Sequence, residues 1–241
     1  MLILSMDTTT PELFVVLAED GLVLASRRTS GQTHMTTLMP SLDEVLEEAG
    51  KSLDQVDYFA CCVGPGSYTG IRIGVAAAQA LAVSENKACL ALDTLDVIAY
   101  EDKPGLERVK VPLLDARNRR VYTKAFLGDE VLIPTGVYGV DDFFPALEQA
   151  LKEKGMAEAT VTLMGDEASG IYAEDRALQE KIKLHLEASD RTYYVPEQMA
   201  QVAEQAARQG LGLDPAELLP RYYQKTQAER ERLEKTDHDR A

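Results

Sequence analysis

The chain of 241 residues contains no tryptophan, and it has only three cysteines and three histidines. Cys61 and Cys62 are adjacent in an apolar run, and neighbouring side chains of a strand point to opposite faces. Three cysteines do not make the disulfide framework of a small secreted protein. No histidine or cysteine belongs to a pair at the spacing that metal sites use. The sequence therefore predicts no metal site and no cofactor.

Long apolar runs are lacking as well. No run approaches the roughly 18 apolar residues that indicate a membrane-spanning helix. The first residues, Met1–Asp7, are typical of a short strand that ends in an acid, and not of the basic and apolar regions of a signal peptide. We therefore expect a cytoplasmic protein that makes no use of a membrane.

Positive charge is scarce. The chain has 25 Lys and Arg against 40 Asp and Glu, which gives a formal net charge of −15. Binding to nucleic acid needs clustered cations that neutralise phosphates. The chain alone is therefore not expected to bind nucleic acid, although another subunit of a complex could supply a basic surface.

What the sequence does contain is an α/β pattern that occurs twice. Strand, Asp, turn, strand, turn, strand, helix, strand, loop and helix follow in this order in both halves, and Asp115 takes the place of Asp7. Such a duplication predicts two α/β lobes, each with a mixed sheet and flanking helices. A polar segment at Glu101–Gly105 indicates the boundary. We expect an N-terminal lobe at residues 1–103, a C-terminal lobe at 106–220, which includes a helix at Pro196–Gln209, and a charged tail at 221–241.

The segment Cys61–Gly74 is the most distinctive motif. It predicts a buried strand, a glycine-rich turn at Gly64–Gly70, and a helix that runs to about Val83. A glycine-rich turn before a helix can hold a phosphate, but the lysine of a P-loop is missing. Tight packing of the helix on the sheet is the other interpretation, and we favour it.

Asp7 and Asp115 end the first strands of the two halves, which is where actin-like ATPases and sugar kinases organise nucleotide and Mg²⁺. That use needs turns through which backbone amides approach phosphates. Neither turn here contains glycine, and Pro11 removes an amide. We regard acids that cap the turns of an inherited fold as the better interpretation. A vestigial nucleotide site at Asp7 and Asp115 stays as the alternative.

The helix after the glycine turn lacks the polar side that a surface helix needs. One of its stripes suits the sheet, and the opposite stripe is mostly small and apolar. That second stripe holds Arg72, Val75, Ala76, Gln79 and Val83. Either another element of this chain or a partner protein covers it, and we expect a partner.

Several motifs together resemble the TsaB (YeaZ) family. They are Ile3–Thr9, His34 with Leu38–Pro40, Gly64–Gly74, Leu114–Arg117 with Val121–Tyr122, and Pro220–Tyr223. The resemblance is close over the N-terminal lobe and looser over the C-terminal lobe. It implies a duplicated actin-like ATPase (ribonuclease H-like) fold.

The resemblance also implies a function. TsaB proteins are non-catalytic subunits in the synthesis of N6-threonylcarbamoyladenosine next to the tRNA anticodon. The sister subunit TsaD would transfer the threonylcarbamoyl group to tRNA, and TsaE would be the ATPase partner. The family's interface with TsaD uses the first two helices, which adds Met39 to the expected interface.

One departure separates this chain from TsaD itself. TsaD-like proteins carry a metal-binding His-x-x-x-His pair at the helix after the fifth strand, and the corresponding segment here, Leu90–Val97, has no histidine. The leading interpretation is thus a scaffold that binds TsaD and meets tRNA only through the complex. An ATPase or small-molecule kinase that uses Asp7 and Asp115 is the alternative, and a homodimer through the same helices is compatible with the first.

Overall fold

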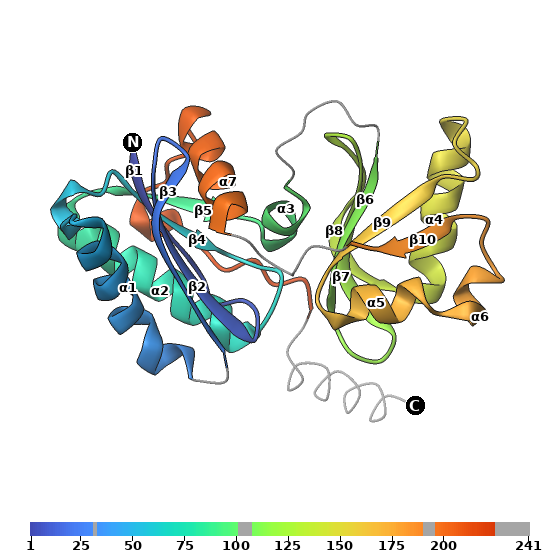
Figure 1. The fold of residues 1–241 in the computed structure, drawn as a ribbon, viewed down its shortest axis with the longest axis horizontal. Coiled ribbons are helices and arrows are strands. Elements are labelled where there is room, and N and C mark those ends of the chain that lie inside the picture. The colour runs from blue at the N-terminus through green and yellow to red at the C-terminus, as the bar shows by residue number, and fades with distance from the viewer. Residues whose placement is uncertain (31–32, 101–107, 190–195, 225–241) are drawn as a thin grey trace, which may run out of the picture.

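The computed structural model describes residues 1–30, 33–100, 108–189 and 196–224. These form two lobes that lie side by side, with a short helix between them (Figure 1). The expected lobe boundary at Glu101–Gly105 and most of the charged tail lie outside the described residues.

The first lobe is built on a five-stranded sheet of order β3-β2-β1-β4-β5. The antiparallel β1, β2 and β3 form one half of the sheet, and β4 and β5 continue it in parallel from β1. β1 and β4 are buried along nearly their whole length because helices cover both faces. The strands are β1 (Leu2–Asp7), β2 (Glu12–Glu19), β3 (Leu22–Ser30), β4 (Tyr58–Cys62) and β5 (Ala88–Leu92).

The second sheet has the order β10-β9-β6-β7-β8. Each of its strands holds the place of its counterpart in the first sheet, with β6 as the central strand in place of β1. The expected α/β fold with two lobes and mixed sheets is confirmed. The strands are β6 (Val109–Asp115), β7 (Arg120–Leu127), β8 (Glu130–Gly139), β9 (Thr160–Gly165) and β10 (His185–Ala188).

Helices cover both faces of the first sheet. α1 (His34–Ala49) and α2 (Tyr68–Glu85) pack on one face, and α3 (Thr94–Ala99) and α7 (Pro196–Arg208) pack on the other. On the second sheet, α4 (Val140–Glu153) and α5 (Glu167–Ala173) share a core with the strands, together with the short α6 (Arg176–Gln179).

The two lobes share part of a core. Leu114 of β6 and Met164 of β9 belong to the apolar cluster that α3 and α7 form with the first sheet. The lobes are therefore joined by buried apolar contacts in addition to the chain that links them.

The position of α7 differs from the expectation. We placed this helix in a C-terminal lobe at 106–220, but it packs on β1, β2, β3 and β5 of the first sheet. Met199, Ala200 and Ala203 are buried there, and Gln201 Nε2 donates to Gly21 O at 3.0 Å. The physical reason is that the six residues of α3 are too few to cover this face of the sheet.

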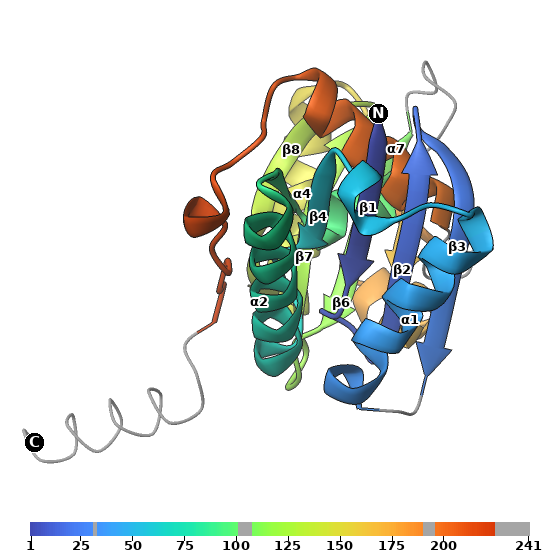
Figure 2. The same ribbon diagram turned by 90° about the vertical axis from the view of Figure 1, so that its left-hand side faces the viewer.

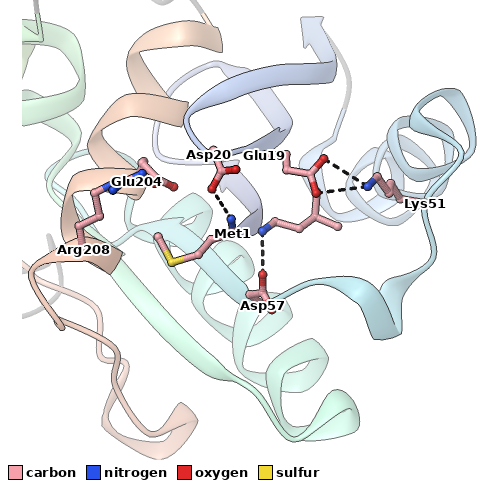
Figure 3. A network of polar contacts seen from close by, with 8 residues as sticks. Met1, Glu19, Asp20, Lys51, Asp57, Glu204 and Arg208 are labelled. Carbon is pink, nitrogen blue, oxygen red and sulfur yellow. Dashed lines mark hydrogen bonds and ion pairs between the residues drawn. The ribbon is translucent and has the colours of Figure 1, made fainter.

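A cluster of polar residues lies where α7 meets one end of the first sheet (Figure 3). Glu204 of α7 is buried and binds Arg208 at 2.7 Å, and it lies near the amino group of Met1. That amino group pairs with Asp20 of the β2–β3 turn at 2.5 Å. The helix that follows the second lobe is thus integrated into the first lobe.

Candidate functional site: the glycine turn, α2 and the C-terminal segment

The glycine turn packs directly against the turn that follows β1. Thr8 Oγ1 donates to Gly70 O and Ser67 N donates to Thr9 O, both at 2.6 Å. A Cβ atom at Gly70 would lie 1.8 Å from Thr8 O, and one at Gly66 would lie 2.3 Å from Thr9 O. Only glycine permits this approach, so these glycines serve close packing between two turns.

Several amides of the two turns already have partners within the chain. Gly70 N donates to the Ser67 hydroxyl that caps α2, and Thr9 N donates to Asp7 Oδ1 at 2.7 Å. Thr8 and Thr9 are almost fully buried. The amides of Thr9, Ser67 and Gly70 therefore bind the protein's own turns and cap, and they are not available to a phosphate.

Asp7 and Asp115 end equivalent strands but differ in exposure. Asp7 has no exposed surface. Asp115 is exposed, and its carboxylate accepts from Arg117 N at 2.9 Å. The amide of Asp115 donates to Asp166, and burial raises the pKa of that second carboxyl. A fully buried carboxylate has no access to a hydrated Mg²⁺ in this arrangement, and within the described residues no group of three or more His, Cys, Asp or Glu gathers around a possible metal.

The expected partner stripe of α2 divides into two sides. Val75 is only 4% exposed and belongs to the core beneath the helix. Gln79 is half-buried, and its Nε2 donates to Pro215 O at 2.9 Å and to Leu218 O at 3.0 Å. Neither residue is free for a partner, because Val75 is buried in the core and the chain's own C-terminal segment binds Gln79.

The remaining expected residues stay at the surface. Arg72 and Ala76 are exposed, as is Val83 with 68% of its surface accessible. Met39 of α1 is 47% exposed. We call these four residues the helix face.

The segment that covers α2 is the C-terminal strap, residues 211–224, which includes the 3₁₀ turn η2 (Pro215–Glu217). It extends the sheet beside β5, since Leu213 and Cys89 exchange backbone hydrogen bonds of 2.8 and 2.9 Å. It then follows α2 (Figure 2) and buries Leu218. The sequence did not predict that this segment covers α2. The motif Pro220–Tyr223, which lies within it, indicated only the family resemblance.

The strap ends at the start of α2 and at the second lobe. Arg221 N donates to Val63 O at 2.8 Å, and Tyr222 stacks on Tyr68 with ring centroids 4.5 Å apart. Gln224 Nε2 donates to Ala116 O, just after β6, at 3.5 Å. The strap thereby connects the glycine turn, the aromatic end of α2 and the second lobe.

A shallow hollow of about 340 Å³ lies on the exposed side of α2. Its lining consists of Tyr68, Thr69, Arg72, Ile73 and Ala76. The Arg72 guanidinium lies 5.6 Å from the centre of the Tyr68 ring, so the one cation of the lining sits over an aromatic ring. The hollow thus combines apolar walls with a positive charge, and it opens on the helix face.

The junction between the lobes uses the acids of α3. Asp93 caps α3 and accepts from Thr135 of β8 at 3.2 Å, and burial raises its pKa. Asp96 pairs with Lys124 of β7 at 2.5 Å. These carboxylates stand in the segment where TsaD-like proteins are expected to carry histidines, and here they bind the second lobe.

Comparison with known proteins shows the family to which the chain belongs. Residues 25–231 match the family model of TsaD, tRNA N6-adenosine threonylcarbamoyltransferase, which is more than half of the chain. The chain is 35% identical to the TsaB protein of Escherichia coli over 132 residues, 54% of this chain and 57% of that protein. It is 28% identical to TsaB of Bacillus subtilis over 170 residues, 70% of this chain and 72% of that protein. The chain belongs to the TsaB/YeaZ branch of the TsaD family.

The matched region spans a little over half of the E. coli relative. Among solved structures, YeaZ from Pseudomonas aeruginosa matches 92% of this chain and 99% of its own length, with a TM-score of 0.71 and 23% identity. The ethanolamine utilization protein EutJ from Carboxydothermus hydrogenoformans matches 84% of this chain and 90% of its own, with a TM-score of 0.52 and 10% identity. These matches confirm the duplicated actin-like fold. Among the described residues, no helix has the length and apolar character to cross a membrane.

Proposed function

We propose that the protein acts in the biosynthesis of tRNA threonylcarbamoyladenosine as a non-catalytic subunit that binds TsaD. The curated relatives that carry the name TsaB are named for this biosynthesis. In this proposal TsaD transfers the threonylcarbamoyl group to N6 of the adenosine 3′ of the anticodon, and this chain holds TsaD in its active arrangement. The chain itself needs no cofactor, meets tRNA only through the complex, and works in the cytoplasm.

The observation that carries the proposal is the exposed helix face beside a closed glycine turn. Arg72, Ala76 and Val83 of α2 and Met39 of α1 are exposed, and Arg72 is the one charged residue among these four. By contrast, Asp7 and its turn are buried. The chain thus offers a surface for a protein, and it buries one of the two acids that would organise a nucleotide in an actin-like ATPase.

The proposal extends to two further partners. TsaE, as the ATPase of the system, would act on the complex with TsaD and not on this chain alone. In the absence of TsaD, a second copy of this chain would occupy the helix face, so a homodimer and the complex with TsaD are mutually exclusive.

Binding to purified TsaD, measured by co-purification and followed by a tRNA modification assay, tests the proposal. Ala76→Asp places a charge in an exposed apolar position and should abolish both binding and modification. Ile171→Asp is the matched control, because Ile171 is 64% exposed on α5 of the second lobe. Wild-type protein that fails to bind TsaD, or equal binding by the two variants, contradicts the proposal.

The alternative function is an ATPase or small-molecule kinase. Its support is the equivalence of Asp7 and Asp115 at the ends of β1 and β6 in two sheets of the same topology. Calorimetry with MgATP on the isolated chain separates the two functions. Micromolar binding that Asp115→Ala abolishes favours the enzyme, and Asp115 suits this test because it is exposed.

A further inference from the structure

The C-terminal strap exposes large side chains beside the helix face. Leu219 is 64% exposed and Tyr222 is 44% exposed, whereas Leu218 between them and η2 is fully buried. Surface leucines are ordinary when they stand alone. Here the two side chains continue an apolar and aromatic surface that already includes Tyr68, which is 42% exposed.

Contacts fix the backbone beside Leu219 and the ring of Tyr222 in place. Gln79 of α2 holds the carbonyl of Leu218, so the backbone of Leu219 is attached to the helix. Tyr222 stacks on Tyr68 at an interplanar angle of 24°, and Arg221 N is bound to Val63. Side chains that are already ordered lose little conformational entropy when a partner covers them.

The positive charge of Arg72 indicates which chemical groups a partner would carry. Arg72 is the one charged residue of α2 before Glu85 at its end, in a chain with a net charge of −15. The guanidinium lines the hollow together with apolar atoms of Ile73 and Ala76. A helix with an apolar side chain for the hollow and a carboxylate for Arg72 has the chemistry that fits this surface.

We propose that the docking surface for TsaD extends from the helix face onto the strap, where Leu219 and Tyr222 contact a TsaD helix of this chemistry. The inference rests on the proposed function. It adds the strap to the interface, a segment that is far in sequence from the helix face. The strap has two roles in it. Its inner side binds Gln79 and buries Leu218, and its outer side meets the partner.

A comparison of two leucines in the strap tests the inference. Leu219→Asp and Leu211→Asp both place a charge at an exposed position, since Leu211 is 55% exposed. Leu211, however, lies before the bridge between Leu213 and Cys89, at the far end of the strap from Tyr68. The dissociation constant with purified TsaD is measured by calorimetry for wild type, both variants and Ala76→Asp, and the thermal midpoint of each variant serves as the check on folding.

We expect Leu219→Asp to raise the dissociation constant about tenfold or more. Leu211→Asp should change it by less than about twofold, as other surface substitutions do. Tyr222→Ala is a second variant of the same surface and should weaken binding in the same direction.

The outcomes separate the two proposals. If wild type binds, Ala76→Asp does not, and Leu219→Asp and Tyr222→Ala bind as wild type does, the strap is outside the interface and only this inference is overturned. If wild type does not bind TsaD, the proposed function itself fails. If Leu219→Asp abolishes self-association of the isolated chain and leaves binding to TsaD unchanged, a second copy and not TsaD occupies the strap, which also overturns the inference.

Discussion

Replacement of Gly70 by alanine tests whether the glycine turn exists for close packing. The new Cβ would lie 1.8 Å from the backbone oxygen of Thr8. No flexible side chain can yield there, because the obstacle is the backbone of the buried turn after β1. The turn would have to move away from α2 by more than about one ångström to reach ordinary contact distance.

Three effects determine how much Gly70→Ala lowers the free energy of unfolding. Forcing an additional methyl group into a packed site costs about 1–3 kcal/mol. Displacement of Thr8 also breaks the buried hydrogen bond from its hydroxyl to Gly70 O, which costs about 1–3 kcal/mol. Because alanine has a higher helix propensity than glycine, the substitution also stabilises the helix by about 1 kcal/mol. We therefore expect Gly70→Ala to lower the free energy of unfolding by about 3 kcal/mol, or the melting temperature by about 6–12 °C.

Gly170→Ala is the matched control, because Gly170 also lies inside a helix, α5, and an added Cβ there meets nothing within 4 Å. This variant should be as stable as wild type or more stable by about 0.5–1 kcal/mol. Urea and thermal unfolding, followed by circular dichroism, measure both variants. Equal midpoints for Gly70→Ala and wild type would refute the close-packing explanation, and a destabilised variant that phosphate restores would favour an anion site instead.

Four further results are expected. Val75→Asp should yield insoluble or unfolded protein, in contrast to the folded Ala76→Asp, because a charge is buried at a position that is 4% exposed; solubility and circular dichroism show this. Gln79→Ala should speed amide exchange across the strap around Leu218, measured by mass spectrometry, since two hydrogen bonds of the strap are lost. Burial raises the pKa of Asp93, so its protonation stabilises the fold at pH values below its ordinary pKa of 3.8, and this contribution is lost as pH rises through the raised pKa. Asp93→Asn should therefore be more stable relative to wild type at pH 7 than at pH 4, by urea midpoints, and a constant difference would contradict the assignment. All three thiols should resist a thiol reagent at pH 8 until urea is added, since they are buried and burial raises the pKa of Cys89 to about 11.

The elements and the fold were readable from the sequence because apolar periodicity reports local structure directly. The duplicated order of strands predicted two sheets of the same topology, and the structure has them. β8 continues through Pro134, which an edge strand tolerates although proline ordinarily interrupts a strand pattern.

The sequence did not predict which segment packs against each element. The small apolar residues of α2 indicated that something covers the helix, but a pattern within one helix does not identify the covering segment. Leu218 lies far from α2 in the sequence, and the strap it belongs to, not a partner, binds Gln79. The amphipathic pattern of α7 likewise gives the side that is buried and not the sheet that receives it.

The return of α7 to the first sheet makes the second lobe an insertion. Chain from both ends of the sequence, up to Tyr100 and from Pro196 onward, builds the first lobe, and the second lobe is spliced between these points. Removal of residues from the C-terminus would thus strip the first lobe of a helix and of the strap. A single-lobe protein is instead obtained by excising the middle and joining residue 100 to residue 196 by a linker, and this would retain the helix face and the strap together.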